Sequence, residues 1–111
     1  LERAKAFYEA LLDVEIFPLD MTGENGSMLG MFPDKGGVGG ALVQNEQHGY
    51  MPSHQGTLVY FSARGSLDEM LKRVEPAGGQ VLLPKTSIGE HGFVAWLEDT
   101  EGNRVGLHSM S

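Results

Sequence analysis

The sequence predicts an α+β fold in which one order of elements, a helix followed by three strands, occurs twice. Two amphipathic helical segments are each followed by short apolar segments with the alternation of strands. The halves also match at a nearly constant offset, so that Leu1 corresponds to Leu67 and Pro18 to Pro84. Chance matching between short amphipathic pieces is the alternative, but the agreement in type, order and spacing of the elements favours a repeat.

The first module is predicted over residues 1–44. Residues 1–12 form an amphipathic helix, whose apolar stripe comprises Ala4, Phe7, Tyr8, Leu11 and Leu12. Strands are expected at residues 14–19, 27–32 and 38–44, with turns at 22–26 and 33–37. Residues 45–56 show no periodicity and are predicted to be a connector, a loop length that is typical of covers and linkers.

The second module is predicted over residues 57–111 and begins with a strand at 57–63. Ser66 and Glu69 form a capping-box pattern that starts a helix, and Gly78 with Gly79 ends it. A strand follows at residues 80–84, then a loop at 85–91. The opening strand of this module has no counterpart before Leu1, so the first strand of module 1 is missing from this chain.

The closing segment, residues 92–109, is predicted to be a β-hairpin that reverses at residues 99–103. Its first arm, residues 93–97, is apolar on both faces and is therefore expected to be buried on both. In the second arm Gly106 and His108 share one face, where glycine leaves room and histidine offers chemistry.

The length, charge and amino-acid composition of the chain exclude several functional classes. At 111 residues the chain is predicted to be a single domain. It has no cysteine, which excludes disulfides, thiolate metal sites and a cysteine nucleophile, and we expect a cytoplasmic protein. The formal charge of -7 disfavours nucleic acid and anionic lipid as partners. No apolar run approaches the roughly 18 residues of a membrane span. An unpaired sheet edge at the missing strand invites pairing, either with a strand outside this chain or with another chain, and we expect a homodimer.

Three segments resemble the vicinal oxygen chelate superfamily, which includes glyoxalase I, bleomycin-resistance proteins, fosfomycin-resistance enzymes and extradiol dioxygenases. They are LERAKAFYEALL at 1–12, VYFSARGSLDEMLKRVEPAGGQVLLP at 59–84 and LEDTEGNRVGLHS at 97–109. The closing DxEGNxxGLHS pattern is similar to an uncharacterised, glyoxalase-related branch. The resemblance implies two tandem βαβββ modules that form a cupped mixed sheet, with the helices outside and the substrate site inside.

Metal-dependent members of this superfamily place a His or Gln and a Glu from each module around one divalent ion. The resemblance puts the last-strand Glu at Gly106, its first-module counterpart at Ala41 and the second-module His at Leu58. None of these side chains can ligate a metal, and the fourth position falls on the missing strand. We therefore expect no cofactor at the usual place, whereas a divalent metal held by another ligand set remains open.

His108 lies on the same face as Gly106 and is the candidate catalytic residue, as a general base or a displaced ligand. The alternative is a partly solvated histidine near the end of the chain. Tyr60 could donate a hydrogen bond to a bound carbonyl and Trp96 could form the pocket floor, although both also suit a core. The loop histidines 48, 54 and 91 have no metal-binding spacing, which favours solvated side chains.

These observations predict a glyoxalase, bleomycin-resistance or dioxygenase-like protein that binds a small organic molecule in the cup. The expected binding residues are Leu58, Tyr60, Trp96, Ala41 and Gly106. Two alternatives stay open. One is a metal-dependent lyase, isomerase or dioxygenase with a non-standard ligand set, including a lactoylglutathione lyase-like activity. The other is a non-catalytic dimerisation module.

Overall fold

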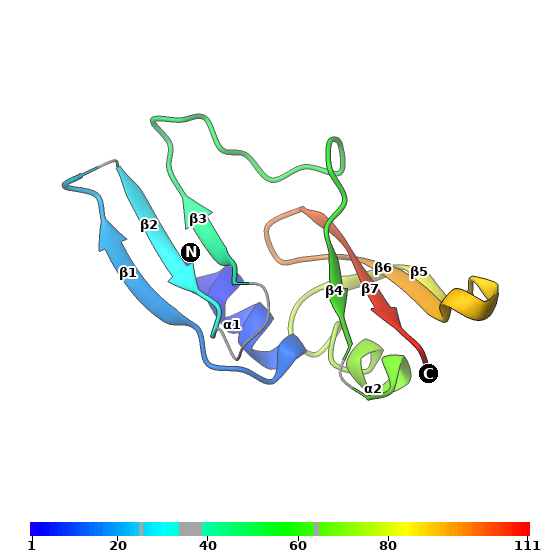
Figure 1. Cartoon of the computed structure of the whole chain (residues 1–111). Coiled ribbons are helices and arrows are strands. Elements are labelled where there is room, and N and C mark those ends of the chain that lie inside the picture. The colour runs from blue at the N-terminus through cyan, green and yellow to red at the C-terminus, as the bar shows by residue number, and fades with distance from the viewer. Residues whose placement is uncertain (25, 34–38, 64) are drawn as a thin grey trace. The chain divides into compact units, whose positions relative to one another are not determined.

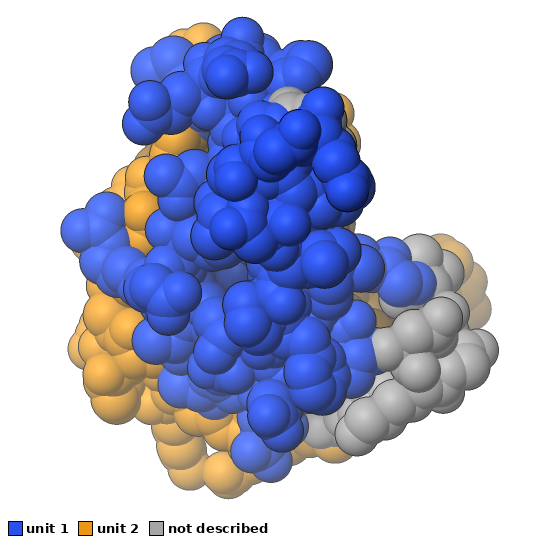
Figure 2. Space-filling model, turned by 90° about the vertical axis from the view of Figure 1, so that its left-hand side faces the viewer, with its two compact units in different colours: residues 1–51 blue, residues 52–111 orange. Residues whose placement is uncertain are grey.

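The computed structural model describes residues 1–24, 26–33, 39–63 and 65–111, and confirms an α+β fold (Figure 1). The chain divides into two compact units, Leu1–Met51 and Pro52–Ser111, which Figure 2 colours separately. The boundary between them falls inside the predicted connector, residues 45–56. No helix among the described residues has the length and apolar character needed to cross a membrane.

Unit 1 consists of a helix and a three-stranded antiparallel sheet (Figure 1). Helix α1 spans Glu2–Leu12, and the strands are β1 (Phe17–Met21), β2 (Ser27–Met31) and β3 (Ala41–Gln44), in the order β1-β2-β3. The predicted apolar stripe of α1 is largely buried, comprising Ala4, Phe7, Tyr8 and Leu11. The amphipathic pattern therefore gave the correct buried face of this helix.

The turn that joins α1 to β1 is held by the side chain of Glu9. Its carboxylate accepts a hydrogen bond of 2.9 Å from the backbone N–H of Ile16 and an ion-pair contact of 3.2 Å from Lys5 Nζ. These contacts, the backbone hydrogen bond first, hold the pKa of Glu9 below its ordinary value. The charged form of Glu9 is thus coupled to the folded turn.

Unit 2 contains a four-stranded sheet with the order β4-β7-β6-β5. The strands are β4 (Tyr60–Ser62), β5 (Gln80–Ser87), β6 (Phe93–Glu98) and β7 (Arg104–Ser109), and the helices are α2 (Leu67–Leu71) and the 3₁₀ turn η1 (Gly89–His91). Strand β4 pairs in parallel with β7, whereas the other pairs are antiparallel. Helix α2 contacts β5 and β7, and Leu67, Leu97 and Leu107 are fully buried in this unit.

The two units repeat the same order of elements, as predicted. Taken from its other edge, the second sheet runs β5-β6-β7-β4, so β1-β2-β3 of the first sheet corresponds to β5-β6-β7. Among the described residues the first sheet has no counterpart of β4, which agrees with the predicted missing strand. The division into modules at residues 1–44 and 57–111, within a single domain, stays a prediction.

Several element boundaries differ from those predicted. Strand β5 continues to Ser87 through what was predicted to be a loop, because Thr86 and Ser87 pair with β6 across two register irregularities. Helix α2 ends at Leu71, well before Gly78, and Pro76 disfavours helix at the preceding residue. The predicted turn at 33–37 and the start of the strand at 38–44 lie largely outside the described residues, as does position 25 of the turn at 22–26.

The hairpin of β6 and β7 reverses through a buried Asp99, which is 5% exposed. Its Oδ1 accepts hydrogen bonds from the backbone N–H groups of Glu101 (2.8 Å) and Asn103 (2.9 Å), and its Oδ2 accepts one from Asn103 Nδ2 (3.0 Å).

One face of the hairpin is buried. The prediction that β6 is buried on both faces was wrong, since Trp96 and Val94 on the second face are only half-buried.

Candidate functional site

The second face of the unit 2 sheet carries two rows of side chains set by the strand register. Each row takes one residue from β4, one from β7 and one from β6: Tyr60, Gly106 and Trp96 in the first row, and Ser62, His108 and Val94 in the second. Successive residues of a strand point to opposite faces, so these six positions share one face. The face opposite to the buried core therefore collects most of the polar and aromatic candidates.

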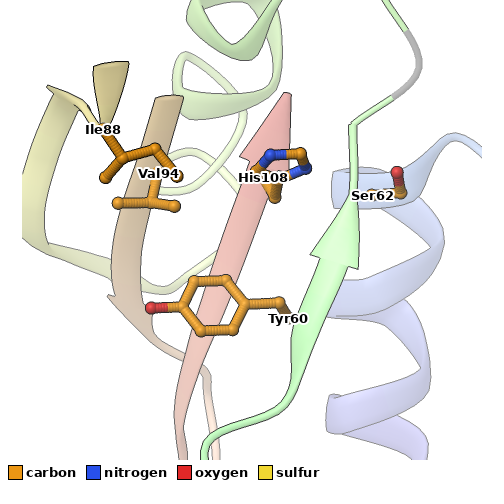
Figure 3. Close-up of a pocket in the computed structure, with 5 residues that line it drawn as sticks. All are labelled: Tyr60, Ser62, Ile88, Val94 and His108. Atoms are coloured by element: carbon orange, nitrogen blue, oxygen red, sulfur yellow. The ribbon is translucent and has the colours of Figure 1, made fainter. Parts of the chain in front are cut away.

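An open pocket of about 480 Å³ lies on this face. It is lined by Tyr60, Ser62, Ile88, Val94 and His108, and Figure 3 shows the His108 ring over β7 between Val94 and Ser62. Its volume falls within the range of small-molecule sites in proteins. The walls are mainly apolar, and the polar groups among the lining residues are those of Tyr60, Ser62 and His108.

His108 has a defined hydrogen-bonding state. Its Nε2 lies 2.7 Å from the backbone carbonyl oxygen of His91. A carbonyl oxygen only accepts, so Nε2 carries the proton, and Nδ1 of the neutral ring keeps a free lone pair. The 3₁₀ turn η1 thus fixes the tautomer of His108 and leaves Nδ1 as the basic atom.

The Tyr60 ring covers Gly106. A Cβ atom at Gly106 would lie 2.9 Å from Tyr60 Cγ and closer still to Cδ1 and Cε1. The Tyr60 ring lies across β7 (Figure 3). Its hydroxyl accepts a hydrogen bond of 2.7 Å from Trp96 Nε1, which holds the ring there. The space that a side chain at Gly106 would need is therefore occupied by an aromatic ring.

The residues at the positions implied for a divalent metal do not fit one. Gly106 has no side chain, and Tyr60, rather than Leu58, is the residue registered beside it. Leu58 lies just before β4, and Ala41 lies on β3 of unit 1, opposite Met31. Within the described ranges no three His, Cys, Asp or Glu side chains are grouped so as to hold a metal ion. The donor set therefore supports no metal chemistry at these positions.

Further along the same face lie Arg104, which contacts Trp96, and a contact between Glu98 and His54. The Arg104 guanidinium lies over the indole ring, 5.2 Å from its centroid. Glu98, the cross-strand neighbour of Arg104, instead contacts His54, with 2.6 Å between Oε2 and Nε2. These residues form the polar end of the face.

The loop histidines do not gather into one site. The ring of His48 lies beside the Tyr50 ring, 5.8 Å between centroids, His54 pairs with Glu98, and His91 contributes its backbone carbonyl to His108. The pocket also contains three residues that the sequence analysis did not select. Ser62 and Val94 follow from strand alternation next to Tyr60 and Trp96, but nothing in the sequence places Ile88 there.

A family model for the Glyoxalase/Bleomycin resistance protein/Dioxygenase superfamily matches residues 1–107. The chain belongs to this superfamily. The resemblance inferred from its three sequence segments is thereby confirmed. A search of curated proteins found no significant match.

Solved structures of this superfamily and of related proteins share the fold. Hypothetical protein SA1046 from S. aureus is similar at TM-score 0.73 and 19% identity, covering 98% of this chain and 85% of that one. A glyoxalase-related enzyme from Fulvimarina pelagi gives 0.67 and 18%, covering 98% and 79%. The E126Q mutant of the fosfomycin resistance protein FosX from Listeria monocytogenes, complexed with Mn(II) and 1S,2S-dihydroxypropylphosphonic acid, gives 0.68 and 16%, covering 100% and 84%. At these identities the likeness establishes the fold alone.

Proposed function

We propose that this superfamily member binds a small organic molecule in the His108 pocket, without a divalent metal at the usual position. The observation that carries the proposal is the Tyr60 ring lying over Gly106 and fixed by its hydrogen bond to Trp96. An aromatic ring there supplies a flat apolar contact surface where metal-dependent relatives would need a carboxylate. A ligand can use this surface, since aromatic rings contribute strongly to apolar binding.

The remaining lining residues place apolar and polar groups at different positions in the pocket. Val94 and Ile88 form an apolar wall, whereas the Ser62 hydroxyl and His108 Nδ1 offer hydrogen bonds at the other positions. A pocket with apolar walls and few polar groups orients a small ligand through those groups. A planar or short aliphatic compound with one hydroxyl or carbonyl suits this arrangement.

Trp96 provides the test, because it is the only tryptophan of the chain. In a screen of small aromatic and carbonyl compounds, binding should shift the single indole N–H resonance of Trp96 in a ¹⁵N correlation spectrum. A His108→Ala variant should weaken the compounds that are found, while Lys72→Ala, an exposed residue on another surface, should leave them unchanged. A failure of all compounds to shift this resonance would contradict the proposal.

A second candidate function, proton transfer on the bound molecule, is favoured by one observation. The Nε2–H of His108 is committed to the His91 carbonyl, so Nδ1 is the nitrogen with which the neutral ring would accept a proton. In that case exchange of an acidic C–H of the ligand with deuterated solvent should be accelerated by the protein and lost in His108→Gln. The homodimer and the cytoplasmic location stay predictions. Light scattering of the purified protein would test the homodimer.

A further inference from the structure

Arg104 has an unusual environment for a charged residue on a sheet face. Its guanidinium lies over the Trp96 ring, and its Nε is shielded from solvent without a hydrogen-bond partner among the described residues. A buried N–H without an acceptor is unfavourable, whereas an oxyanion satisfies two N–H groups of a guanidinium at once. The Nε–H of Arg104 therefore lacks an acceptor among the described residues, and an oxyanion that reached the guanidinium would supply one.

The carboxylate expected to pair with Arg104, that of Glu98, makes its contact with another residue. Glu98 is paired with Arg104 across the β6–β7 ladder, where opposite charges normally attract. Its Oε2 instead lies 2.6 Å from His54 Nε2, and the side chains of His54 and Glu98 are 42% and 36% exposed. The cross-strand carboxylate of Glu98 is thus held by His54 in a separate contact.

The segment that carries His54 is anchored to the hairpin by its backbone. The N–H of Ser53 donates to Asn103 Oδ1 at 3.1 Å, and the N–H of Arg104 donates to the carbonyl oxygen of Ser53 at 3.3 Å. Asn103 is itself held by Asp99. His54 therefore reaches Glu98 from a fixed position.

We infer that Arg104 is an anion-binding subsite, so that the ligand of the proposed pocket carries a carboxylate or a phosphonate. This inference rests on the proposed function and names the class of ligand. Arg104 lies outside the pocket lining but is linked to it on the same sheet face, because Arg104 contacts Trp96, Trp96 donates to Tyr60, and Tyr60 lines the pocket.

The spacing of residues along β7 determines how far the Arg104 subsite lies from His108. Arg104 and His108 lie on the same face of β7, and four residues of strand separate their Cα atoms by about 14 Å. Both side chains extend from this face, so an apolar body on the Tyr60 ring can place an oxyanion at Arg104. A benzene ring with one acidic substituent is the simplest compound with these properties.

The test compares three probes of the same size: benzoate, phenylphosphonate and the uncharged benzyl alcohol. Each is titrated into the whole chain while the Trp96 indole resonance reports the dissociation constant. We expect both anions to bind on the order of tenfold or more tightly than benzyl alcohol, as for a hydrogen bond to a charged group. The tighter of the two anions identifies the oxyanion.

Four variants separate the subsite from general effects on the fold. Arg104→Gln should abolish the preference for the anions and leave benzyl alcohol unchanged, and Lys72→Gln, which removes a cation elsewhere, should alter neither. His54→Ala releases Glu98 to pair with Arg104 and should weaken the anions several-fold. Glu98→Gln added to His54→Ala should restore their affinity. A structural role of Arg104 would not produce this rescue.

The outcomes distinguish this inference from the proposed function. If benzyl alcohol binds as tightly as benzoate, and Arg104→Gln changes neither, the anion subsite is wrong while the pocket stands. If no probe binds to the unmodified protein, both the subsite and the pocket are contradicted. If Arg104→Gln is not folded by circular dichroism, the His54→Ala and His54→Ala/Glu98→Gln pair decides the question with Arg104 intact.

Discussion

Replacing Gly106 by alanine tests the arrangement at the centre of the site. The added Cβ would lie 2.9 Å from Tyr60 Cγ and closer to two other ring atoms, so the ring has to leave its position over β7. That movement breaks the 2.7 Å hydrogen bond between Trp96 Nε1 and the Tyr60 hydroxyl. Gly106→Ala therefore perturbs packing and one hydrogen bond together.

The size of the effect follows from these two contributions. Overpacking of a well-packed site costs about 1–3 kcal/mol, and a lost hydrogen bond about 1 kcal/mol. Tyr60 is 44% exposed and can swing toward solvent, which favours the lower end of the packing cost. The two contributions add to about 2 kcal/mol, so we expect Gly106→Ala to lower the free energy of unfolding by about that amount.

A double-mutant cycle with Tyr60→Ala measures the coupling. In urea unfolding followed by circular dichroism, Gly106→Ala should be close to neutral once the ring is absent, since alanine also restricts the unfolded chain more than glycine does. The Trp96 indole resonance should shift in each variant that displaces the ring. An equal cost of Gly106→Ala with and without the Tyr60 ring would refute the packing assigned to this site.

Three further substitutions test other parts of the structure. Asp99→Ala removes three hydrogen bonds at the buried hairpin turn and should cost about 2–3 kcal/mol in urea unfolding; a cost below about 0.5 kcal/mol would contradict its role. Leu107→Ala, at a fully buried position, should cost about 2–5 kcal/mol, and the same change at the partly exposed Leu82 should cost clearly less. Glu9 has a folded pKa below its ordinary value of 4.5, so its stabilising effect is present above that pH and is lost as the pH falls through the folded pKa. Glu9→Gln should accordingly reduce the loss of thermal stability between pH 7 and pH 3, and an unchanged pH profile would oppose this assignment.

Much of the fold could be predicted because it follows from short-range patterns. The apolar stripe of α1 and the alternation in β7 identify buried faces directly, and the internal repeat gives the order of elements. Boundaries were less accurate where pairing with a neighbour decides them. Strand β5 extends to Ser87 because β6 offers partners there, which the local sequence of that loop does not show.

The shared face of the candidate residues could be predicted for the same reason, whereas their roles stay predictions. His108, Gly106, Tyr60 and Trp96 share a face by alternation and register. The sequence could not show that the Tyr60 ring fills the space at Gly106, since this depends on a parallel pairing between distant segments. The contact of His54 with Glu98 likewise depends on how the connector is anchored to the hairpin.

Calorimetric titration of chelator-treated, desalted protein with MnCl₂ tests the central claim most directly. The claim is that the face carrying Gly106 and Tyr60 is a ligand-binding surface in place of the usual divalent metal site. We predict no saturable binding of manganese, and no change in thermal stability when it is added. Saturable binding of one equivalent that is lost in His108→Ala would contradict the account.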